Sequence, residues 1–262
     1  MSNLTSKVAL VTGSSGGIGR STALEFANRG ADLVIQYNKN EDEAKNVAQE
    51  IGRLGRTAVL AQVDFSNFKA SPKMVQEMVD LAVSRLGRVD ILVNLAGYPA
   101  KGEWKKSLLD LTPDDFLKPI YVDLFGSFLC SRILAPQFLK QKSGVIVNVS
   151  STPALSGHDR GFAFTVAKAG VIGLTLSAAA TYAPRGIRVN CVAPGLIRTP
   201  MTARLTGNEA SLKASTAMHA LGRIGEPADV AAALEWLLSP EQSWVTGQVL
   251  GIDGGLSTVR PR

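Results

Sequence analysis

Short apolar segments alternate with longer amphipathic segments along the whole chain. In each short segment the apolar residues stand at consecutive positions, and many of them are β-branched. Uninterrupted apolar runs of this kind are typical of parallel strands that are buried on both faces. The pattern predicts strands over residues 8–11, 33–35, 58–63, 91–93, 145–149, 187–192 and 249–252.

The longer segments carry the start and stop signals of helices. Residues 41–54 end at Gly55, Thr112 precedes a proline and two acidic residues, and Glu226 opens a segment that runs to Leu238. These are the residue types that end helices, cap them and occupy their first turn. Because strands and helices alternate, we predict a Rossmann-like α/β fold, a doubly wound parallel sheet of about seven strands with helices on both faces.

Length and composition agree with one domain of this class. The chain has 262 residues, of which 45% are hydrophobic and 19% are charged. This length is ordinary for a single α/β domain, and no repeat or linker interrupts the pattern. We therefore expect a single domain over residues 1–262. The two cysteines, Cys130 and Cys191, are expected to be reduced core residues.

Charge and apolar content restrict the expected partners. The net charge of +6 is dispersed, with its densest basic spots at residues 105–106 and 260–262. No basic stripe is interleaved with aromatic residues, so we expect no nucleic-acid partner. The chain begins without a basic and apolar leader, and its longest apolar stretch, residues 171–183, is too short to span a bilayer. We expect a cytoplasmic protein with no membrane partner and no metal site.

A glycine-rich cluster at residues 12–19 follows the first predicted strand and opens a helix. Small residues there allow a tight turn and a close approach of the backbone to a pyrophosphate, and the helix N-terminus offers free N–H groups to the phosphates. The cluster could also be a simple tight turn, but its place between a strand and a helix favours a dinucleotide site. The candidate binding residues are Gly13, Ser15, Gly17, Ile18 and Gly19.

The end of the second predicted strand bears on which dinucleotide binds. An NAD site usually has an acidic residue about 20 residues past the glycines, where it binds the ribose 2′-hydroxyl. This chain has Tyr37 there, followed by Asn38 and Lys39. A ribose 2′-phosphate bound there would not be repelled by a carboxylate and would be attracted by Lys39. We therefore expect NADP(H) in preference to NAD(H). Lys39 could alternatively be a solvated residue at the start of the next helix.

Two further strand ends complete the candidate nucleotide site. Asp64, followed by Phe65, can accept a hydrogen bond from the adenine amino group. After the fourth predicted strand, Asn94, Ala96 and Gly97 allow the chain to pass close to adenosine and ribose. Asn94 could equally cap the end of its strand.

With these residues in place, the chain resembles the short-chain dehydrogenases/reductases, and it is most similar to the 3-oxoacyl-carrier-protein reductases and the glucose and steroid dehydrogenases among them. The resemblance implies an NAD(P)-dependent enzyme that interconverts a ketone and a secondary alcohol, of 3-oxoacyl type or similar. Ala180 counts against a carrier-protein substrate, because reductases of that kind tend to have a basic residue there. The motifs that carry the resemblance are residues 12–19, Asp64, residues 94–97, Ser151, Lys168, and residues 194–199, 222–227 and 253–255.

The resemblance also implies roles for single residues. Ser151 would hydrogen-bond the substrate oxygen. Lys168 would bind the nicotinamide ribose and lower the pKa of a neighbouring tyrosine, which would transfer the proton. The residues that would line the nicotinamide are Pro194, Gly195, Ile197 and Thr199.

Two catalytic positions depart from the family pattern. Phe164 stands where the tyrosine is expected and has no proton to give, and Asp123 replaces an asparagine that holds a water in the proton relay. Acid–base help of this kind is worth about 10²–10⁴ in rate, so we expect the proton-transfer step to be impaired or rerouted. His158 and Tyr98 are alternative proton donors, unless they have only loop and packing roles.

Three hypotheses on function follow. The chain could be an NADP(H)-dependent reductase in which water, Ser151 or another group supplies the proton. It could instead be a catalytically silent or trapped nucleotide-binding member that acts as a sensor or partner subunit. A non-redox enzyme such as a lyase is disfavoured, because the nucleotide motifs are intact.

The segment after Phe164 and a later polar region suggest assembly and a lid. Residues 169–182 are small and apolar nearly all round, which indicates that more than one face of this helix is covered. Family members commonly pair this helix across two-fold axes, so we expect a homo-oligomer, a dimer or a tetramer, although the helix could be covered within its own subunit. The resemblance places a substrate lid at about residues 199–220.

Overall fold

Seven parallel strands form the centre of the part of the chain that the computed structural model describes, residues 3–99 and 102–259. Their order in the sheet is β3-β2-β1-β4-β5-β6-β7. All seven predicted strands are present, which confirms the prediction of a doubly wound parallel sheet. The basic residues 260–262 lie outside the described residues. The strands are β1 Val8–Val11, β2 Asp32–Tyr37, β3 Ala58–Gln62, β4 Ile91–Asn94, β5 Gly144–Val149, β6 Ile187–Pro194 and β7 Val249–Ile252.

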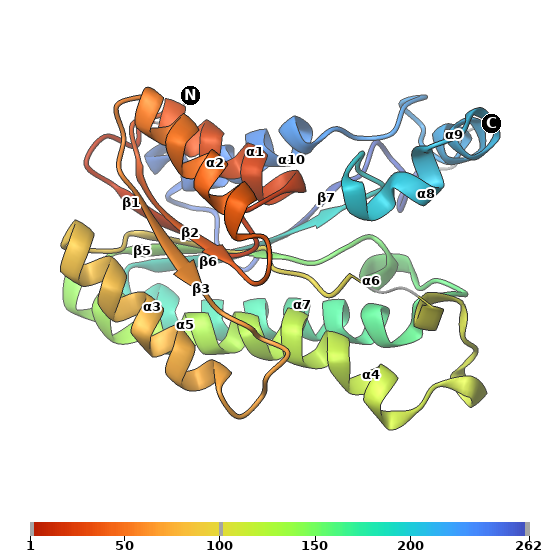
Figure 1. Cartoon of the computed structure of the whole chain (residues 1–262), viewed down its shortest axis with the longest axis horizontal. Coiled ribbons are helices and arrows are strands. Elements are labelled where there is room, and N and C mark those ends of the chain that lie inside the picture. Colours follow the sequence, from red (N-terminus) through yellow and green to blue (C-terminus); the bar gives the residue numbers. More distant parts are fainter. Residues whose placement is uncertain (1–2, 100–101, 260–262) are drawn as a thin grey trace.

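Helices cover both faces of this sheet (Figure 1). One layer consists of α1 (Gly17–Asn28), α2 (Glu41–Arg53) and α10 (Pro227–Leu238), and the other of α3 (Ser71–Leu86), α5 (Gly126–Gln141) and α7 (Phe162–Tyr182). The shorter helices are η1 Gly102–Lys105, η2 Leu108–Asp110, α4 Pro113–Pro119, η3 Ile120–Phe125, α6 Pro153–Ser156, η4 Ala183–Arg185, η5 Pro200–Thr202, α8 Ala203–Thr206, α9 Glu209–Ala217 and η6 Pro240–Gln242.

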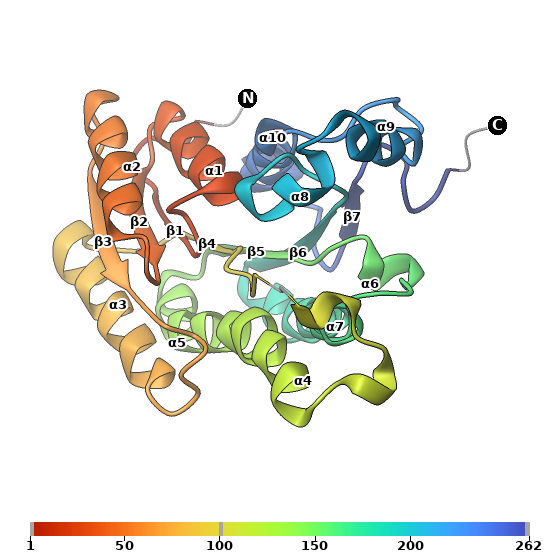
Figure 2. The same cartoon turned by 45° about the vertical axis from the view of Figure 1, so that its right-hand side comes forward.

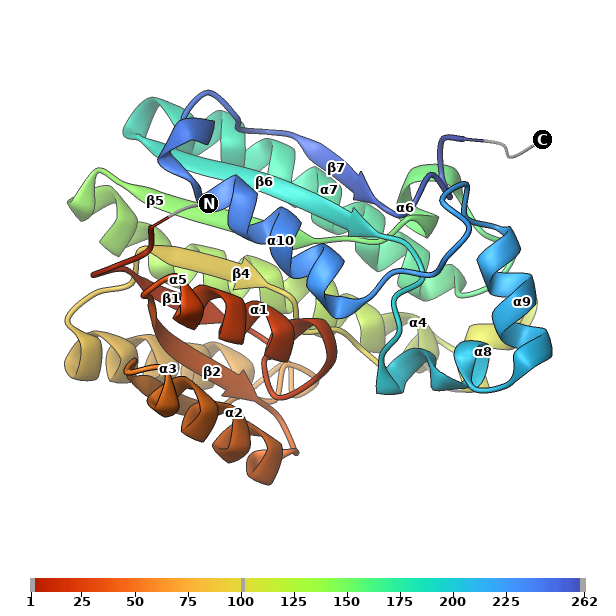
Figure 3. The ribbon, with the colours of Figure 1, turned by 90° about the horizontal axis from the view of Figure 1, so that it is seen from above.

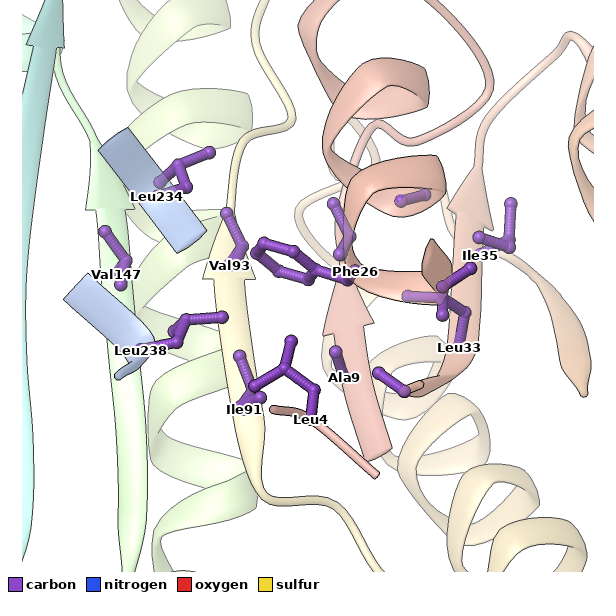
Figure 4. Close-up of a cluster of buried hydrophobic side chains, with 14 of the residues drawn as sticks. Leu4, Ala9, Phe26, Leu33, Ile35, Ile91, Val93, Val147, Leu234 and Leu238 are labelled. Carbon is purple, nitrogen blue, oxygen red and sulfur yellow. The ribbon is translucent and has the colours of Figure 1, made fainter. Parts of the chain in front are cut away.

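The five strands between the two edge strands bury both of their faces, which explains their uninterrupted apolar runs. Leu33 and Ile35 of β2 lie in the hydrophobic cluster under α1 and α10, and Phe26 of α1 fills the middle of that cluster (Figure 4). Val34, the residue between them, lies in the second cluster under α3 and α5. Successive side chains of a strand point to opposite faces, so a strand between two helix layers needs an apolar residue at every position.

The predicted helix starts are present with their caps. Thr112 caps α4, where its Oγ1 accepts from the backbone N–H of Asp115 at 3.2 Å. Glu226 caps α10 in the same reciprocal way with Asp229. Both cysteines are free and buried, and burial raises the pKa of Cys130 to about 12 and that of Cys191 to about 11. Both thiols are therefore protonated and unreactive at neutral pH.

The helix α7 is longer and more apolar than the sequence pattern predicted. The helical run Phe162–Arg185, with a mean hydropathy of 1.6, is the one segment of the described chain that is long and apolar enough to cross a membrane by length and composition alone. The prediction that the longest apolar stretch is too short for this was wrong, because the helix begins well before Val171. In the fold α7 lies along the sheet against β6 and η3, and it carries the buried charge of Lys168.

The order of strands reverses between β1 and β4, and this position places the candidate site. The chain winds outward to β3 on one side of β1 and outward to β7 on the side of β4. At such a switch point the loops that leave the carboxyl ends of the strands turn apart and leave a crevice. All strands point to the same edge of the sheet, where α4, α6, α8 and α9 gather (Figure 3).

Truncating a core side chain of β2 should lower stability sharply. Leu33 is fully buried, so Leu33→Ala is expected to reduce the free energy of unfolding by about 2–5 kcal/mol. Leu109 is 95% exposed, and Leu109→Ala should change it by less than about 0.5 kcal/mol. Urea unfolding at one fixed protein concentration measures both. Equal losses in the two variants would contradict this description of the core.

Candidate active site

The glycine-rich turn between β1 and α1 needs residues without side chains at two positions. A Cβ on Gly19 would overlap the carbonyl oxygen of Gly13, and a Cβ on Gly13 would lie 2.9 Å from Cα of Ala96. Gly13 also has a φ of +68°, which favours glycine. By contrast, no atom lies within 4 Å of the place where a Cβ on Gly16 would be. The turn is therefore packed tightly against β4 and leaves open space at Gly16.

The N-terminus of α1 faces this open space without a cap. Gly16 occupies the N-cap position, so no side chain satisfies the first N–H groups of the helix, and its first turn contains no acidic residue. Gly17 and Ile18 follow at the first helical positions, and Ser15 precedes the cap. Uncapped N–H groups together with the positive end of the helix dipole form an anion site. A dinucleotide pyrophosphate fits this arrangement.

Two polar residues that sequence reasoning missed hold the turn in place. Gln36, inside the apolar strand β2, accepts from the backbone N–H of Gly13 at 2.8 Å and donates to the carbonyl of Val63 at 2.9 Å. The hydroxyl oxygen of Thr12 accepts from the N–H groups of Leu95 and Ala96, each at 2.9 Å. Together they tie the turn to β2, β3 and β4. The signal in the sequence was a glutamine in an otherwise apolar run.

Two aromatic residues at strand ends, Tyr37 and Phe65, have buried side chains. Tyr37 belongs to the core cluster under α1, and Phe65 is buried against Gly126, whose Cβ would lie 3.0 Å from its ring. Both rings are withdrawn into the core because they have apolar neighbours there, so contacts to a ligand from these positions would come from the backbone. Asn38 and Lys39 are exposed, and Asn38 donates to Asp64 at 3.3 Å.

Asn94 lies in a buried network of hydrogen bonds. Its side chain is 3% exposed and donates to Asn148 of β5 at 2.8 Å and to Ser131 of α5 at 3.2 Å. The neighbouring backbone at Ala96 and Gly97 instead runs along the glycine-rich turn and past Asp123. The segment 94–97 therefore shapes the crevice through its main chain.

The segment after β6 reaches across to the same turn. Pro194 ends β6, and Gly195 packs so closely on Asp253 that a Cβ there would lie 2.9 Å from its Cα. Ile197 is buried, and a methyl group of Thr199 lies 3.4 Å from the place where a Cβ on Gly17 would be. The fold thus brings the residues predicted to line the nicotinamide next to the predicted phosphate site.

Lys168 and Asp123 form a buried ion pair at the carboxyl edge of the sheet. The Nζ of Lys168 lies 2.8 Å from Oδ1 of Asp123 and donates to the carbonyl of Val149 at 2.9 Å. The two residues are only 5% and 1% exposed. The other carboxylate oxygen of Asp123 accepts from the N–H of Tyr98 at 3.0 Å. Asp123 sits in the π-helical turn η3, a rare geometry that is frequent at functional sites.

Phe164 lies beside this pair with an apolar ring. The Lys168 ammonium group is 5.8 Å from the centre of that ring. Ser151 follows β5 and is partly buried, and the hydroxyl of its neighbour Ser150 donates to the carbonyl of Lys168 at 2.8 Å. The structure therefore brings Phe164, Lys168 and Asp123 together at the end of β5, and position 164 supplies no acid to this group.

The two alternative proton donors differ in their surroundings. Burial first, and then a hydrogen bond to Glu103 and its charge, raise the pKa of Tyr98, which makes it a weaker acid than an ordinary tyrosine. His158 is exposed in the loop after α6, and its Nδ1 accepts from the backbone N–H of Arg160 at 3.0 Å. Tyr98 is thus poorly suited to release a proton near neutral pH.

Trp104 is a further pocket residue that the sequence did not reveal. Its ring contacts the ring of Phe164 edge-on, with 5.3 Å between the ring centres, and lies 6.0 Å from the ring of His158. Its carbonyl accepts from the N–H of Gly161 at 2.9 Å, and a Cβ on Gly161 would overlap the indole. The possible signal was Gly161 just before the helix, a position with a φ of +67° that only glycine adopts freely.

The region at about residues 199–220 forms the short helices η5, α8 and α9. They lie beyond the carboxyl ends of the strands, on the same side as α6 (Figure 2). Across the described ranges, no group of three or more histidine, cysteine, aspartate or glutamate side chains is arranged to hold a metal ion.

Comparisons with known proteins agree with this geometry. A family model described as enoyl-(acyl carrier protein) reductase matches residues 13–257. The 3-oxoacyl-(acyl-carrier-protein) reductase FabG of Thermotoga maritima is 39% identical over 255 residues, 97% of this chain and 98% of the relative. The (2S)-((R)-hydroxy(phenyl)methyl)succinyl-CoA dehydrogenase subunit BbsD of Thauera aromatica is 38% identical over 251 residues, 96% of each chain.

A solved structure is similar over the same extent. A 7α-hydroxysteroid dehydrogenase complexed with NADH and 7-oxo glycochenodeoxycholic acid has a TM-score of 0.88 at 33% identity, and the match covers 97% of this chain and 95% of that one. Sequence and fold therefore agree over nearly the whole chain.

Adding a methyl group at Gly161 should displace Trp104. Gly161→Ala places a Cβ against the indole, so we expect a red-shifted tryptophan emission and stronger acrylamide quenching. Gly87→Ala is the matched control, because Gly87 is also in the left-handed region, with a φ of +79°, but has no atom within 4 Å of its Cβ position. Both changes should cost about 1–2 kcal/mol of backbone strain. The same emission change in both variants would mean that Gly161 does not hold the indole.

Proposed function

The chain belongs to the short-chain dehydrogenase/reductase family and is an oxidoreductase, and we propose that it moves a hydride between NADP(H) and a ketone or secondary alcohol. The family binds nicotinamide cofactors. The preference for NADP(H) over NAD(H) and a carbonyl substrate of 3-oxoacyl type or similar are the specific parts of the proposal. The observation that carries it is that the uncapped helix α1, the segment after β6 and Lys168 all lie at the carboxyl edge of the sheet, where Thr199 approaches Gly17 and Asp123 joins Gly97 to Lys168.

The nucleotide would lie across this crevice. The backbone from Gly13 to Gly19 would hold the pyrophosphate, and Asp64 would meet the adenine. Position 37 offers no carboxylate, and the exposed Lys39 would attract a 2′-phosphate. The segment from Pro194 to Thr199 would line the nicotinamide, whose reduced or oxidised ring supplies or accepts the hydride when bound.

The chain's own residues would act on the substrate oxygen. The hydroxyl of Ser151 would donate to the carbonyl oxygen, and the ammonium group of Lys168 would bind the nicotinamide ribose. As the carbonyl becomes an alkoxide, negative charge grows on that oxygen, and a positioned donor stabilises it. The final proton would come from water or from a pocket group such as His158, because Phe164 has none. We expect this step to lose much of the about 10²–10⁴-fold that a positioned acid contributes.

A second candidate function is a nucleotide-holding subunit without turnover of its own. Two observations favour it: Phe164 supplies no proton, and Asp123 neutralises Lys168. The relative from Thauera aromatica is itself named as a subunit of a dehydrogenase. In this function the chain would bind the same nucleotide as a sensor or as the partner of an active subunit.

Organisation and assembly are parts of the same proposal. Residues 1–262 would act as one catalytic domain in the cytoplasm, with residues at about 199–220 as its substrate lid. Three large apolar side chains on α7, Phe162, Val166 and Leu176, are exposed in the single chain. Covering them in a homo-oligomer, a dimer or tetramer, would remove this apolar surface from water.

Turnover with and without a tyrosine separates the two functions. We expect NADPH to bind, and we expect NADPH oxidation over a panel of ketones and 3-oxoacyl thioesters to be slow and to rise in Phe164→Tyr toward the about 10²–10⁴-fold that an acid contributes. Phe162→Tyr, two residues earlier on α7, is the matched control and should leave the rate unchanged. Binding without turnover in the unchanged chain would favour the subunit function. Failure to bind either NADPH or NADH would overturn both.

Replacing Lys39 should change the choice between dinucleotides. Loss of one charge-assisted contact to the 2′-phosphate is expected to weaken NADPH binding about tenfold in Lys39→Ala and to leave NADH binding unchanged. Lys45→Ala removes a lysine from the next helix that is 52% exposed and pairs with Glu41, and should change neither affinity. Fluorescence titration of both dinucleotides measures the effect. A parallel loss for NADH would argue against a 2′-phosphate contact.

A further inference from the structure

We propose that Asp123 is a positioning residue whose carboxylate cancels the charge of Lys168, so that positions 123 and 164 act as a coupled pair. In this arrangement a hydroxyl acid at position 164 becomes a stronger proton donor when position 123 is neutral. The inference rests on the proposed function, because it concerns the proton-transfer step of that reaction.

The geometry of the buried pair carries the first step. The Lys168 ammonium and the Asp123 carboxylate are 2.8 Å apart, and both side chains are almost completely shielded from water. Opposite charges at this distance and depth have no net charge, and the field of such a pair falls off faster with distance than the field of a lone ammonium. The ring of Phe164, whose centre is 5.8 Å from Nζ, therefore meets a neutral pair rather than a cation.

Further hydrogen bonds hold the Asp123 carboxylate and the Lys168 ammonium group in place. Asp123 is fixed through its second oxygen by the N–H of Tyr98, and Lys168 by the carbonyl of Val149. These contacts come from the segment after β4, the π-helical turn η3, helix α7 and strand β5. The pair is part of the framework of the site, and ordinary side-chain motion would not separate it.

Among the residues that the structure describes, no other positive charge forms an ion pair with Asp123 or stands in for the Lys168 ammonium. From β6, Cys191 faces Lys168, but burial raises its pKa to about 11, so its thiol is uncharged at neutral pH. From the segment after β4, Tyr98 has a raised pKa and is also uncharged, and its neighbour Glu103 adds negative charge. Within the described residues, Asp123 is the only carboxylate in an ion pair with Lys168.

The consequence concerns the acidity of a phenol placed at this position. A lone ammonium group within about 4–6 Å lowers the pKa of an acid by about 1–3 units, because it stabilises the anion. With Asp123 present this lowering is lost, and an introduced tyrosine would stay protonated well above neutral pH. A phenol of ordinary acidity at position 164 would transfer its proton slowly. Replacing it by a phenyl ring would therefore cost this chain less rate than it would cost a chain with a neutral residue at position 123.

Absorbance titration of the introduced phenol tests the inference without any turnover. The phenolate band is recorded against pH in Phe164→Tyr and in the double variant Phe164→Tyr/Asp123→Asn. The unchanged chain and Asp123→Asn are subtracted, because they contain the native tyrosines only. We expect the introduced phenol to have a pKa about 1–3 units lower in the double variant. Equal pKa values in the two backgrounds would overturn the inference.

A second neutral variant guards against misfolding. Asp123→Ser retains an oxygen that can accept from the N–H of Tyr98 and should give the same lowering. Circular dichroism and NADPH titration establish that each variant is folded and binds. The pH profile of NADPH oxidation should move with the phenol pKa. At pH 7 the double variant should be faster than Phe164→Tyr, by less than about tenfold for each unit of pKa lowering, because general acid catalysis follows Brønsted behaviour.

The outcomes separate this inference from the proposed function. If no variant binds a nicotinamide dinucleotide, the proposed function fails, while the phenol titration still reports on Asp123. If the variants bind and turn over NADPH but the phenol pKa is the same with aspartate, asparagine and serine at position 123, only the coupling fails.

Discussion

The arrangement of the site depends on the need to neutralise one buried charge. An ammonium group with almost no contact with water is unstable unless it has a counter-ion and hydrogen-bond acceptors. Lys168 finds them in Asp123 and in the carbonyl of Val149. Because these partners belong to η3 and β5, and because Asp123 also holds the N–H of Tyr98, the ion pair fixes several elements around the end of β5. The position of Phe164 follows from this framework.

The nucleotide half of the site is built differently, from the main chain and from the absence of side chains. Gly13 and Gly19 allow the turn to pack on β4 and on itself, and Gly16 leaves the N-terminus of α1 open. Gln36 and Thr12 then connect the turn to three neighbouring strands through hydrogen bonds. The nucleotide half therefore requires small or hydrogen-bonding residues at a few positions. The half around Phe164 instead requires a buried carboxylate beside the Lys168 ammonium group.

Much of the fold could be predicted from the sequence, because a strand between two helix layers has an apolar residue at every position and helices carry local caps. The candidate site could be predicted only in part. Position along the chain gave Tyr37 and Phe65 correctly as ends of strands, but it did not give the direction of their rings, which packing decides. Trp104 could not be found, because its contacts with Phe164 and Gly161 join segments that are distant in sequence. The ion pair between Asp123 and Lys168 escaped prediction for the same reason.

The ion pair between Asp123 and Lys168 also limits the evolutionary paths open to this chain. A lineage that acquired tyrosine at position 164 alone would have a phenol of ordinary acidity and would gain only part of the rate that a positioned acid contributes. A lineage that first lost the carboxylate at position 123 would leave a buried ammonium group without its counter-ion, and the protein would become less stable. The first step alone would thus bring a limited gain and the second alone a loss of stability, whereas the two together would bring the full gain in acidity. Such epistasis would favour keeping the two departures as a unit.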